Sequence, residues 1–271
     1  MATMTDDQQA VAPGARRIST DTDPDELVLP TESRRRLGWI ADWLVQPPQV
    51  LKEWGLNRYV DGGFRALFRG PAGTGKTMAA IALGRSTERP VWHVDLGAVV
   101  SKSIGETEKN LRQIFAAASP ENAILLFDEA DALFGRRSEV RDAHDRFANA
   151  EIGHLLRRLE PYEGLAILTT NSTARIDDDV AGRIDLIVDF PMPDDAAREA
   201  LWRQILGNLK LPQDDGLDVG LLARQYALSG AEILRCVRIA ALIAANTDRA
   251  LSIEELQFAA AERLAMREVS P

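Results

Sequence analysis

Residues 70–77 read Gly70-Pro71-Ala72-Gly73-Thr74-Gly75-Lys76-Thr77, which fits the spacing Gly-x-x-x-x-Gly-Lys-[Ser/Thr]. An apolar run, Phe64–Phe68, precedes this stretch, and a helical pattern over 76–85 follows it. Glycines between a strand and a helix let backbone N–H groups turn inward around phosphate oxygens, and the helix N-terminus adds partial positive charge. A chance glycine-rich turn is the alternative, but it leaves the flanking strand and helix unexplained. The stretch therefore predicts a loop that binds the phosphates of a nucleotide.

Two side chains at the end of this loop have predicted chemical roles. Lys76 brings a positive charge to the β- and γ-phosphates, and Thr77 offers a hydroxyl oxygen to Mg²⁺. The expected cofactors are therefore ATP and Mg²⁺. The residues expected to contact the nucleotide here are Pro71, Ala72, Gly73, Thr74, Gly75, Lys76, Thr77 and Met78.

An acidic pair follows a second apolar run. Ala123–Phe127 leads directly into Asp128 and Glu129, and buried acids are costly unless they have a partner. In a parallel sheet the carboxyl ends of the strands form the ligand crevice, where the 70–77 loop also lies. We expect Asp128 to hold Mg²⁺, partly through water, and Glu129 to polarise the water that attacks the γ-phosphate. A solvated acidic turn is the alternative.

Short apolar runs alternate with helical patterns from residue 64 to 192 and then give way to helices alone. This order predicts an α/β fold, with a parallel sheet covered by helices on both faces and a small four-helix lid domain after it. The predicted strands are Phe64–Phe68, Val91–Val94, Ala123–Phe127, Leu165–Thr169 and Leu186–Phe190. Helices are expected near 76–85, 107–118, 142–160 and 177–182, and in the lid near 194–209, 217–227, 230–246 and 253–267.

Four segments are expected along the chain. Residues 30–63 form an N-terminal helical segment and linker, 64–192 the nucleotide-binding domain, and 193–271 the lid. Residues 1–29 hold six acidic and two basic residues among Thr, Gln and Ala. Because so little of this segment can bury itself, we expect a disordered acidic tail. A docking peptide for a partner is the other possibility for these residues.

The composition limits the classes of partner that are expected. The net charge is −9 and no compact Lys/Arg block appears, which disfavours nucleic acid as the main partner, although the channel of a ring can be basic while its rim is acidic. No apolar run reaches the ~18–20 residues of a membrane span, so no membrane insertion is expected. The single cysteine, Cys236, is interpreted as a buried residue rather than a reactive thiol. We expect a cytoplasmic protein.

The two motifs, together with the segments described below, resemble the AAA clade of the AAA+ ATPases over residues 50–267. The run Asp-Glu-Ala-Asp-Ala-Leu-Phe-Gly at 128–135 and the run at 142–149 are most similar to bacterial AAA proteins with a single ATPase module. The resemblance implies a five-stranded sheet in the order 5-1-4-3-2, a four-helix lid, and a homo-oligomeric ring, usually a hexamer. It also implies that ATP is hydrolysed between neighbouring subunits.

The resemblance assigns further site residues. Asn171, after the fourth strand, corresponds to the polar sensor that places the attacking water; a turn-forming asparagine is the alternative. Arg183 corresponds to the arginine finger that acts on the neighbour's γ-phosphate, with a structural salt bridge as the alternative. Relatives carry two or three arginines here, whereas this chain has Gly182 and Asp185 nearby. Gly230 and Ala231 correspond to the start of the lid helix beside the base and ribose.

The segment after the second strand resembles the pore loop of AAA unfoldases. Its expected pore residues are Lys102, Ser103 and Ile104. Unfoldases have an aromatic residue where Ser103 stands, and a serine offers little apolar contact area. Threading of a substrate is therefore in question. A loop that only caps the helix from Glu106 is the alternative.

Three functions follow from these residues. The leading prediction is a ring ATPase that remodels, assembles or disassembles a protein partner, recognised directly or through an adaptor. A slowly hydrolysing, nucleotide-gated scaffold is the second, and a nucleic-acid motor or loader is the third. The histidines, His93, His144 and His154, show no metal-ligand spacing and are interpreted as structural or surface residues.

Overall fold

The computed structural model describes residues 4–5, 10–20, 23–45, 53–55, 58–59, 63–99, 106–128, 130, 162–171, 181–247 and 249–269. The chain divides into two compact units. One comprises Ala2–Pro71 and Lys76–Phe190, and the other comprises Ala72–Gly75 and Pro191–Pro271. The expected boundary between residues 192 and 193 lies two residues from the observed division. Each unit is described by itself.

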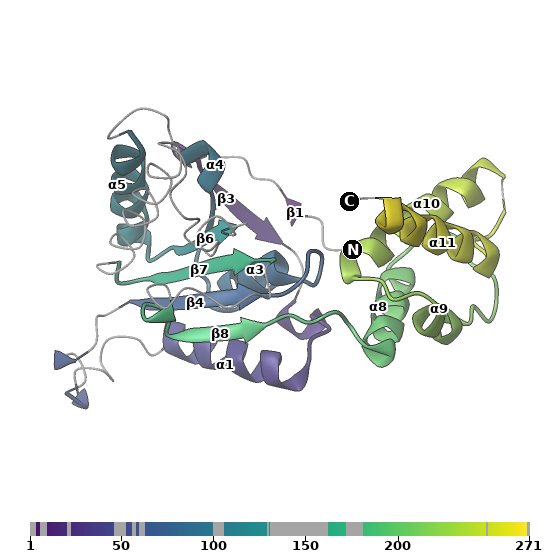
Figure 1. Ribbon diagram of the computed structural model, residues 1–271, viewed down its shortest axis with the longest axis horizontal. Coiled ribbons are helices and arrows are strands. Elements are labelled where there is room, and N and C mark those ends of the chain that lie inside the picture. Colours follow the sequence, from purple (N-terminus) through teal and green to yellow (C-terminus); the bar gives the residue numbers. More distant parts are fainter. Residues whose placement is uncertain are drawn as a thin grey trace. The chain divides into compact units, whose positions relative to one another are not determined.

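The first unit is built on a mostly parallel sheet (Figure 1). Its parallel strands are β8 (Leu186–Asp189), β4 (Phe64–Arg69), β7 (Leu165–Thr170), β6 (Ile124–Asp128) and β5 (Val91–Asp95), side by side in that order. These five strands follow the predicted order 5-1-4-3-2, and each lies within a residue of its predicted bounds. The central strands β4, β7 and β6 are buried on both faces, which is why their apolar runs read as continuous rather than alternating.

The sheet continues beyond β5, where no sequence pattern predicts a strand. β3 (Ala15–Thr20) pairs antiparallel with β5, and β1 (Met4–Thr5) and β2 (Ala10–Ala12) pair antiparallel with β3. The described sheet therefore has eight strands, not five, and its full order differs from the prediction by these additions. The expectation of a disordered tail is wrong for residues 10–20. Ala15 and Ile18 are buried in opposite faces of the sheet, and the open edge of β5 supplies hydrogen-bond partners for β3.

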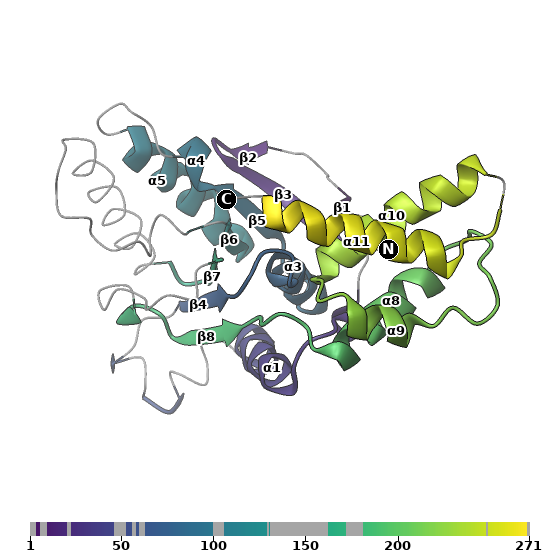
Figure 2. The same cartoon turned by 45° about the vertical axis from the view of Figure 1, so that its right-hand side comes forward.

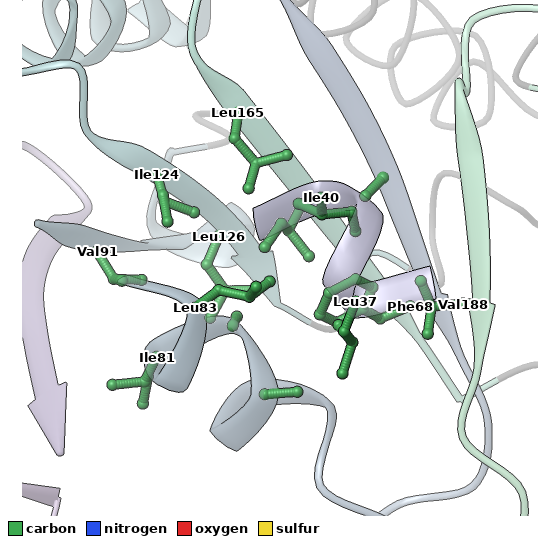
Figure 3. Packing of buried hydrophobic residues seen from close by; sticks show 14 of the residues in the cluster. Leu37, Ile40, Phe68, Ile81, Leu83, Val91, Ile124, Leu126, Leu165 and Val188 are labelled. Atoms are coloured by element: carbon green, nitrogen blue, oxygen red, sulfur yellow. The ribbon is translucent and has the colours of Figure 1, made fainter. Parts of the chain in front are cut away.

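Helices cover both faces of this sheet. On one face α5 (Glu106–Ala118) packs on β5, β6 and β7 through residues such as Leu111, Ile114 and Phe127. On the other, α1 (Thr31–Val45) and α3 (Lys76–Ser86) pack around Phe68, Leu126 and Val188, as the close-up in Figure 3 shows. The short helix α4 (Leu96–Val99) follows β5, and η3 (Ser119–Glu121) follows α5. The expected helix at 142–160 and most of that at 177–182 lie outside the described residues.

The N-terminal segment is held against the second face. η1 (Pro24–Glu26) precedes an extended stretch in which Leu27 and Leu29 pack against the same core as α1 and α3. Ser33 at the start of α1 donates to the carbonyl of Asp189 at 2.6 Å, and the Arg36 guanidinium donates to the carbonyl of Ile187 at 2.6 Å. These bonds attach α1 to β8.

The second unit contains the helices predicted for the lid domain (Figures 1 and 2). Its helices are α8 (Asp195–Gly207), α9 (Val219–Gln225), α10 (Gly230–Asn246) and α11 (Ile253–Val269). Asp194 and Asp218 cap α8 and α9 by accepting backbone N–H groups at 2.8 and 2.9 Å. Trp202, Leu222, Ile233 and Leu256 lie in the common core. None of the described helices in either unit is long and apolar enough to cross a membrane.

Candidate nucleotide-binding site

The loop at 70–77 connects the end of β4 to the start of α3. The N–H of Gly70 donates to the carbonyl of Thr170 at 3.1 Å, which ties the loop to the end of β7. Gly70 has φ +153°, and a Cβ on this residue would lie 2.0 Å from the carbonyl oxygen of Phe190. Gly75 has φ +103°, a conformation that L side chains rarely adopt. The glycine pattern seen in the sequence is therefore required by this backbone.

Lys76 begins α3, and its side chain is directed back over the loop. Its Nζ donates to the carbonyl oxygens of Gly70 at 2.6 Å and Pro71 at 2.9 Å, and to Oδ1 of Asn171 at 2.8 Å. The residue is 7% exposed. A buried ammonium needs such partners, because its desolvation is otherwise costly. Lys76 and Asn171, 95 positions apart in the sequence, thus lie in one hydrogen-bonded group.

Asp128 ends β6, and three side chains from different elements contact its carboxylate. Thr77 of α3 donates to Oδ2 at 3.0 Å, and Thr169 of β7 donates to Oδ1. Nε2 of His93, on β5, lies 3.5 Å from Oδ2. The loop, two flanking strands and Asp128 therefore meet at the carboxyl edge of the sheet, where ligands bind in open parallel sheets.

The Asp128 carboxylate is ionised under all ordinary conditions. Burial by itself raises its pKa, but hydrogen bonds from His93, Thr169 and Thr77 outweigh burial and lower the pKa to about 2. An ionised carboxylate next to a threonine hydroxyl provides the hard oxygen donors that Mg²⁺ prefers. Thr77 and Asp128 consequently fit the metal role predicted for them, and the turned backbone of the loop fits a phosphate group.

Gly230 and Ala231, the residues predicted at the start of the lid helix, lie close to Gly73 of the loop. Gly73 groups with the helical unit, and its carbonyl accepts a hydrogen bond from the N–H of Ala231 at 3.1 Å. Ala231 lies in the first turn of α10, next to Gly230. The small side chains at this helix start allow the approach of the loop backbone.

The other predicted residues either lie in the turn before β8 or fall outside the described residues. Arg183 lies half-buried in the turn before β8, and Asp185, two residues on, accepts the backbone N–H of Arg65 at 2.7 Å. Asp185 thus holds the start of β4 against β8. Glu129 and the predicted pore residues Lys102, Ser103 and Ile104 lie outside the described residues.

The sequence does not predict Thr169 or His93 as site residues, yet both contact Asp128. His93 is the more unexpected of the two. Its spacing matches no metal site, so the sequence indicates only a structural or surface histidine. The structure places it beside Asp128, with 17% of its side chain exposed. A polar residue within the otherwise apolar run Val91–Val94 is the one signal that could have pointed to it.

These features define a P-loop nucleotide-binding fold, in which a glycine-rich loop, its lysine and threonine, and a strand-terminal aspartate surround one site. The sequence model described as "ATPase family associated with various cellular activities (AAA)" matches residues 66–192. The chain thus carries an AAA ATPase domain. The match begins within β4 and ends just after β8, so it covers the loop, four of the parallel strands and most of β4.

Two of the three curated relatives described here are named as an ATPase or a nucleotidase, and the third is named as a proteasome subunit. The chain is 32% identical over 234 residues to "Vesicle-fusing ATPase" of Arabidopsis thaliana, covering 78% of this chain and 30% of that protein. It is 26% identical over 226 residues to "26S proteasome subunit RPT4" of Saccharomyces cerevisiae, covering 81% and 51%. It is 28% identical over 218 residues to "Proteasome-activating nucleotidase" of Saccharolobus solfataricus, covering 77% and 54%.

The chain therefore spans between 30% and 54% of the length of these three relatives. The matched domain and the relatives' names support ATP hydrolysis by this domain. None of these three organisms is a bacterium, so the expected bacterial origin stays a prediction.

Proposed function

We propose that this chain is a Mg²⁺- and ATP-dependent ring ATPase that remodels, assembles or disassembles a protein partner. The observation that carries the proposal is the hydrogen-bonded group at the end of the sheet. In it Lys76 meets Asn171, and Thr77 meets Asp128. Each of these residues has a separate task in phosphoryl transfer, and they come from three elements of the fold.

The chemistry of the site follows from these side chains. Lys76 holds the β- and γ-phosphate oxygens, exchanging its carbonyl partners for phosphate. Thr77 and Asp128 hold Mg²⁺, which when bound neutralises charge on the phosphates. Asn171 orients the attacking water, and Glu129 accepts its proton.

The proposed ring rests on Arg183. A guanidinium supplied by a neighbouring subunit stabilises charge on the γ-phosphoryl group and raises the rate by orders of magnitude. Arg183 lies in the turn that precedes β8, where the family places its arginine finger. Each ATP would then be hydrolysed between two copies of the chain, with a hexamer as the expected assembly.

The nature of the partner is proposed from the relatives. Two of the names refer to the proteasome, which is an assembly of proteins, and the third refers to vesicle fusion. A protein substrate or adaptor is therefore favoured over nucleic acid, and the net charge of −9 agrees. We place the protein in the cytoplasm.

Glu129→Gln tests the shared ATP site. This variant should bind ATP without hydrolysing it, and ATP should shift it to a larger species in size-exclusion chromatography. Arg183→Ala and Glu129→Gln should each lose hydrolysis alone, and an equal mixture should recover part of it. Recovery occurs because an intact Glu129 in one subunit meets an intact Arg183 from the other. An unchanged elution volume with ATP, or no recovery in the mixture, would contradict the ring.

A nucleotide-gated scaffold is the second candidate, and it is favoured by Ser103 and by the single arginine of the 182–185 turn. Ser103→Tyr separates the two. A gain of ATP-dependent unfolding of a tagged fluorescent protein would show that only the serine limits threading. Unaltered behaviour together with slow hydrolysis would favour the scaffold. Stimulation of hydrolysis by DNA or RNA would instead support a nucleic-acid motor.

A further inference from the structure

His93 lies in the middle of β5, but its ring contacts the end of the neighbouring strand. Its register partner on β6 is Leu126, two residues before Asp128. Residues two apart in a strand share a face of the sheet, so the imidazole reaches Asp128 diagonally. The distance from Nε2 to Oδ2 is 3.5 Å, and both side chains are mostly buried, at 17% and 22% exposed.

The side chains that contact Asp128 differ in whether they can themselves become ligands of the metal. The hydroxyls of Thr77 and Thr169 both donate to the carboxylate. Thr77 is itself a predicted Mg²⁺ ligand, so its hydroxyl exchanges Asp128 for the metal. His93 contacts the same oxygen as Thr77, Oδ2, through a nitrogen that carries a proton whenever it donates. A protonated nitrogen cannot ligate a cation, so His93 is left to orient the carboxylate.

The backbone of His93 is held from both sides of β5. β6 pairs with one edge of the strand, and β3 pairs with the other, with Arg16 in register with His93. The nearest carboxylate on the same strand, Asp95, accepts the N–H groups of Gly97 at 2.9 Å and Ala98 at 3.2 Å. Asp95 is therefore engaged with the start of α4 rather than with the imidazole.

We propose that His93 is a positioning residue that holds Asp128 in the orientation needed for Mg²⁺ and ATP to bind together. The inference rests on the proposed function, because it assigns the metal to Asp128 and Thr77. Groups that hydrogen-bond to metal-ligating carboxylates set the orientation of those ligands and contribute to metal affinity. The N-terminal strand β3 contributes indirectly to the position of His93, because it pairs with β5 and so keeps β5 from being the edge strand of the sheet.

The test compares His93→Leu, which removes the donor, with His93→Gln, whose amide retains one. Trp92→Phe is the matched control, because Trp92 is the adjacent residue of β5 and is buried in the core on the α5 face. The probe is a fluorescent ATP analogue, titrated once in EDTA and then with increasing Mg²⁺ at fixed nucleotide. Thermal unfolding without nucleotide is recorded for all three variants.

For His93→Leu we expect the half-saturating Mg²⁺ concentration to rise about 10-fold, with affinity in EDTA close to wild type. His93→Gln should recover most of the Mg²⁺ response, and Trp92→Phe should lower the Tm without altering that response. An unchanged Mg²⁺ response in His93→Leu would overturn the proposal. So would equal loss of affinity with and without Mg²⁺, because that outcome signals only a packing role. If the wild-type protein bound no nucleotide, the proposed function itself would fail.

Discussion

The Nζ of Lys76 lies 2.8 Å from Oδ1 of Asn171, which joins the phosphate-binding loop to the end of β7. The same ammonium also donates to the carbonyls of Gly70 and Pro71. Asn171 is thus hydrogen-bonded to the residue that we propose holds the phosphates, and this contact supports the proposed role of Asn171 as a sensor of the γ-phosphate. This connection separates two roles, binding and hydrolysis, that can be measured independently.

Asn171→Ala should lower ATP hydrolysis about 100-fold, because one preorganised polar group at the reacting centre is lost. Nucleotide affinity should change by less than about threefold, since the variant leaves Lys76, the proposed phosphate-binding group, in place. Phosphate release and fluorescent-nucleotide titration measure the two effects.

Asn171→Asp is the companion variant. It keeps an acceptor for Lys76 but adds a carboxylate that competes with phosphate for the ammonium, so it should weaken binding as well. If Asn171→Ala reduced affinity as strongly as it reduced hydrolysis, the side chain would be a binding group and not a sensor.

The parallel sheet could be predicted because its strands are largely apolar runs, and two of them lead directly into a motif. The run Phe64–Phe68 leads into the glycine loop, and Ala123–Phe127 leads into Asp128. β3 has no such signal. It contains Arg16 and Arg17, and it is stabilised by the edge of β5, about 75 residues away in the chain. Its composition, taken alone, resembles that of a solvated segment.

The contact between His93 and Asp128 also could not be predicted from local sequence patterns. It depends on which strands are neighbours and on the register Asp95↔Asp128 between β5 and β6. The loop, by contrast, carries its chemistry within eight consecutive residues. Local motifs can therefore be found from sequence, whereas side chains that meet across strands require the register.

Ile18→Asp tests whether β3 belongs to the folded unit. Ile18 is 4% exposed and packs in the same core as Val91, its register partner on β5. An unpaired carboxylate in that core should destabilise the unit by roughly 3 kcal/mol, which corresponds to a fall in Tm of about 6–12 °C.

Ser19→Asp provides the matched control, since the neighbouring Ser19 is exposed. It should leave the Tm nearly unchanged in the same thermal melt. Equal Tm values for Ile18→Asp and the wild type would mean that the N-terminal segment is detached from the sheet in solution.

Glu232 gives the helical unit a predictable response to acid. Burial raises the pKa of this carboxyl, but the N–H and hydroxyl of Ser229, with the charges of Arg267 and Arg263, lower it below its ordinary 4.5. Ser229 donates at 2.8 and 2.9 Å, and Arg267 at 3.0 Å. A depressed folded-state pKa contributes stability that is complete above about pH 4.5 and is lost as the pH falls through the folded value.

The stability difference between wild type and Glu232→Gln should therefore be larger at pH 7 than at pH 3.5. Urea unfolding followed by circular dichroism at both pH values measures it. Arg203→Gln is a suitable control, because Arg203 on α8 is an exposed residue whose ion pair with Glu199 should change stability little at either pH. A difference that grows on acidification would exclude an ionised, paired Glu232.

Cys236 should be inert until the helical unit unfolds. The side chain is 1% exposed, and its thiol contacts the carbonyl of Ala259 on α11. Burial and the negative charge of Glu232 raise its pKa to about 11 from 9.0. At pH 8 the thiolate fraction is then about 100-fold lower than in the unfolded chain, and only the thiolate reacts with alkylating reagents.

Iodoacetamide at pH 8 should add no mass to the native protein and one carbamidomethyl group in urea, as measured by intact-mass spectrometry. Because the chain has one cysteine, the modified fraction reports directly on opening of the α10–α11 core, and full modification under native conditions would show that this core opens readily.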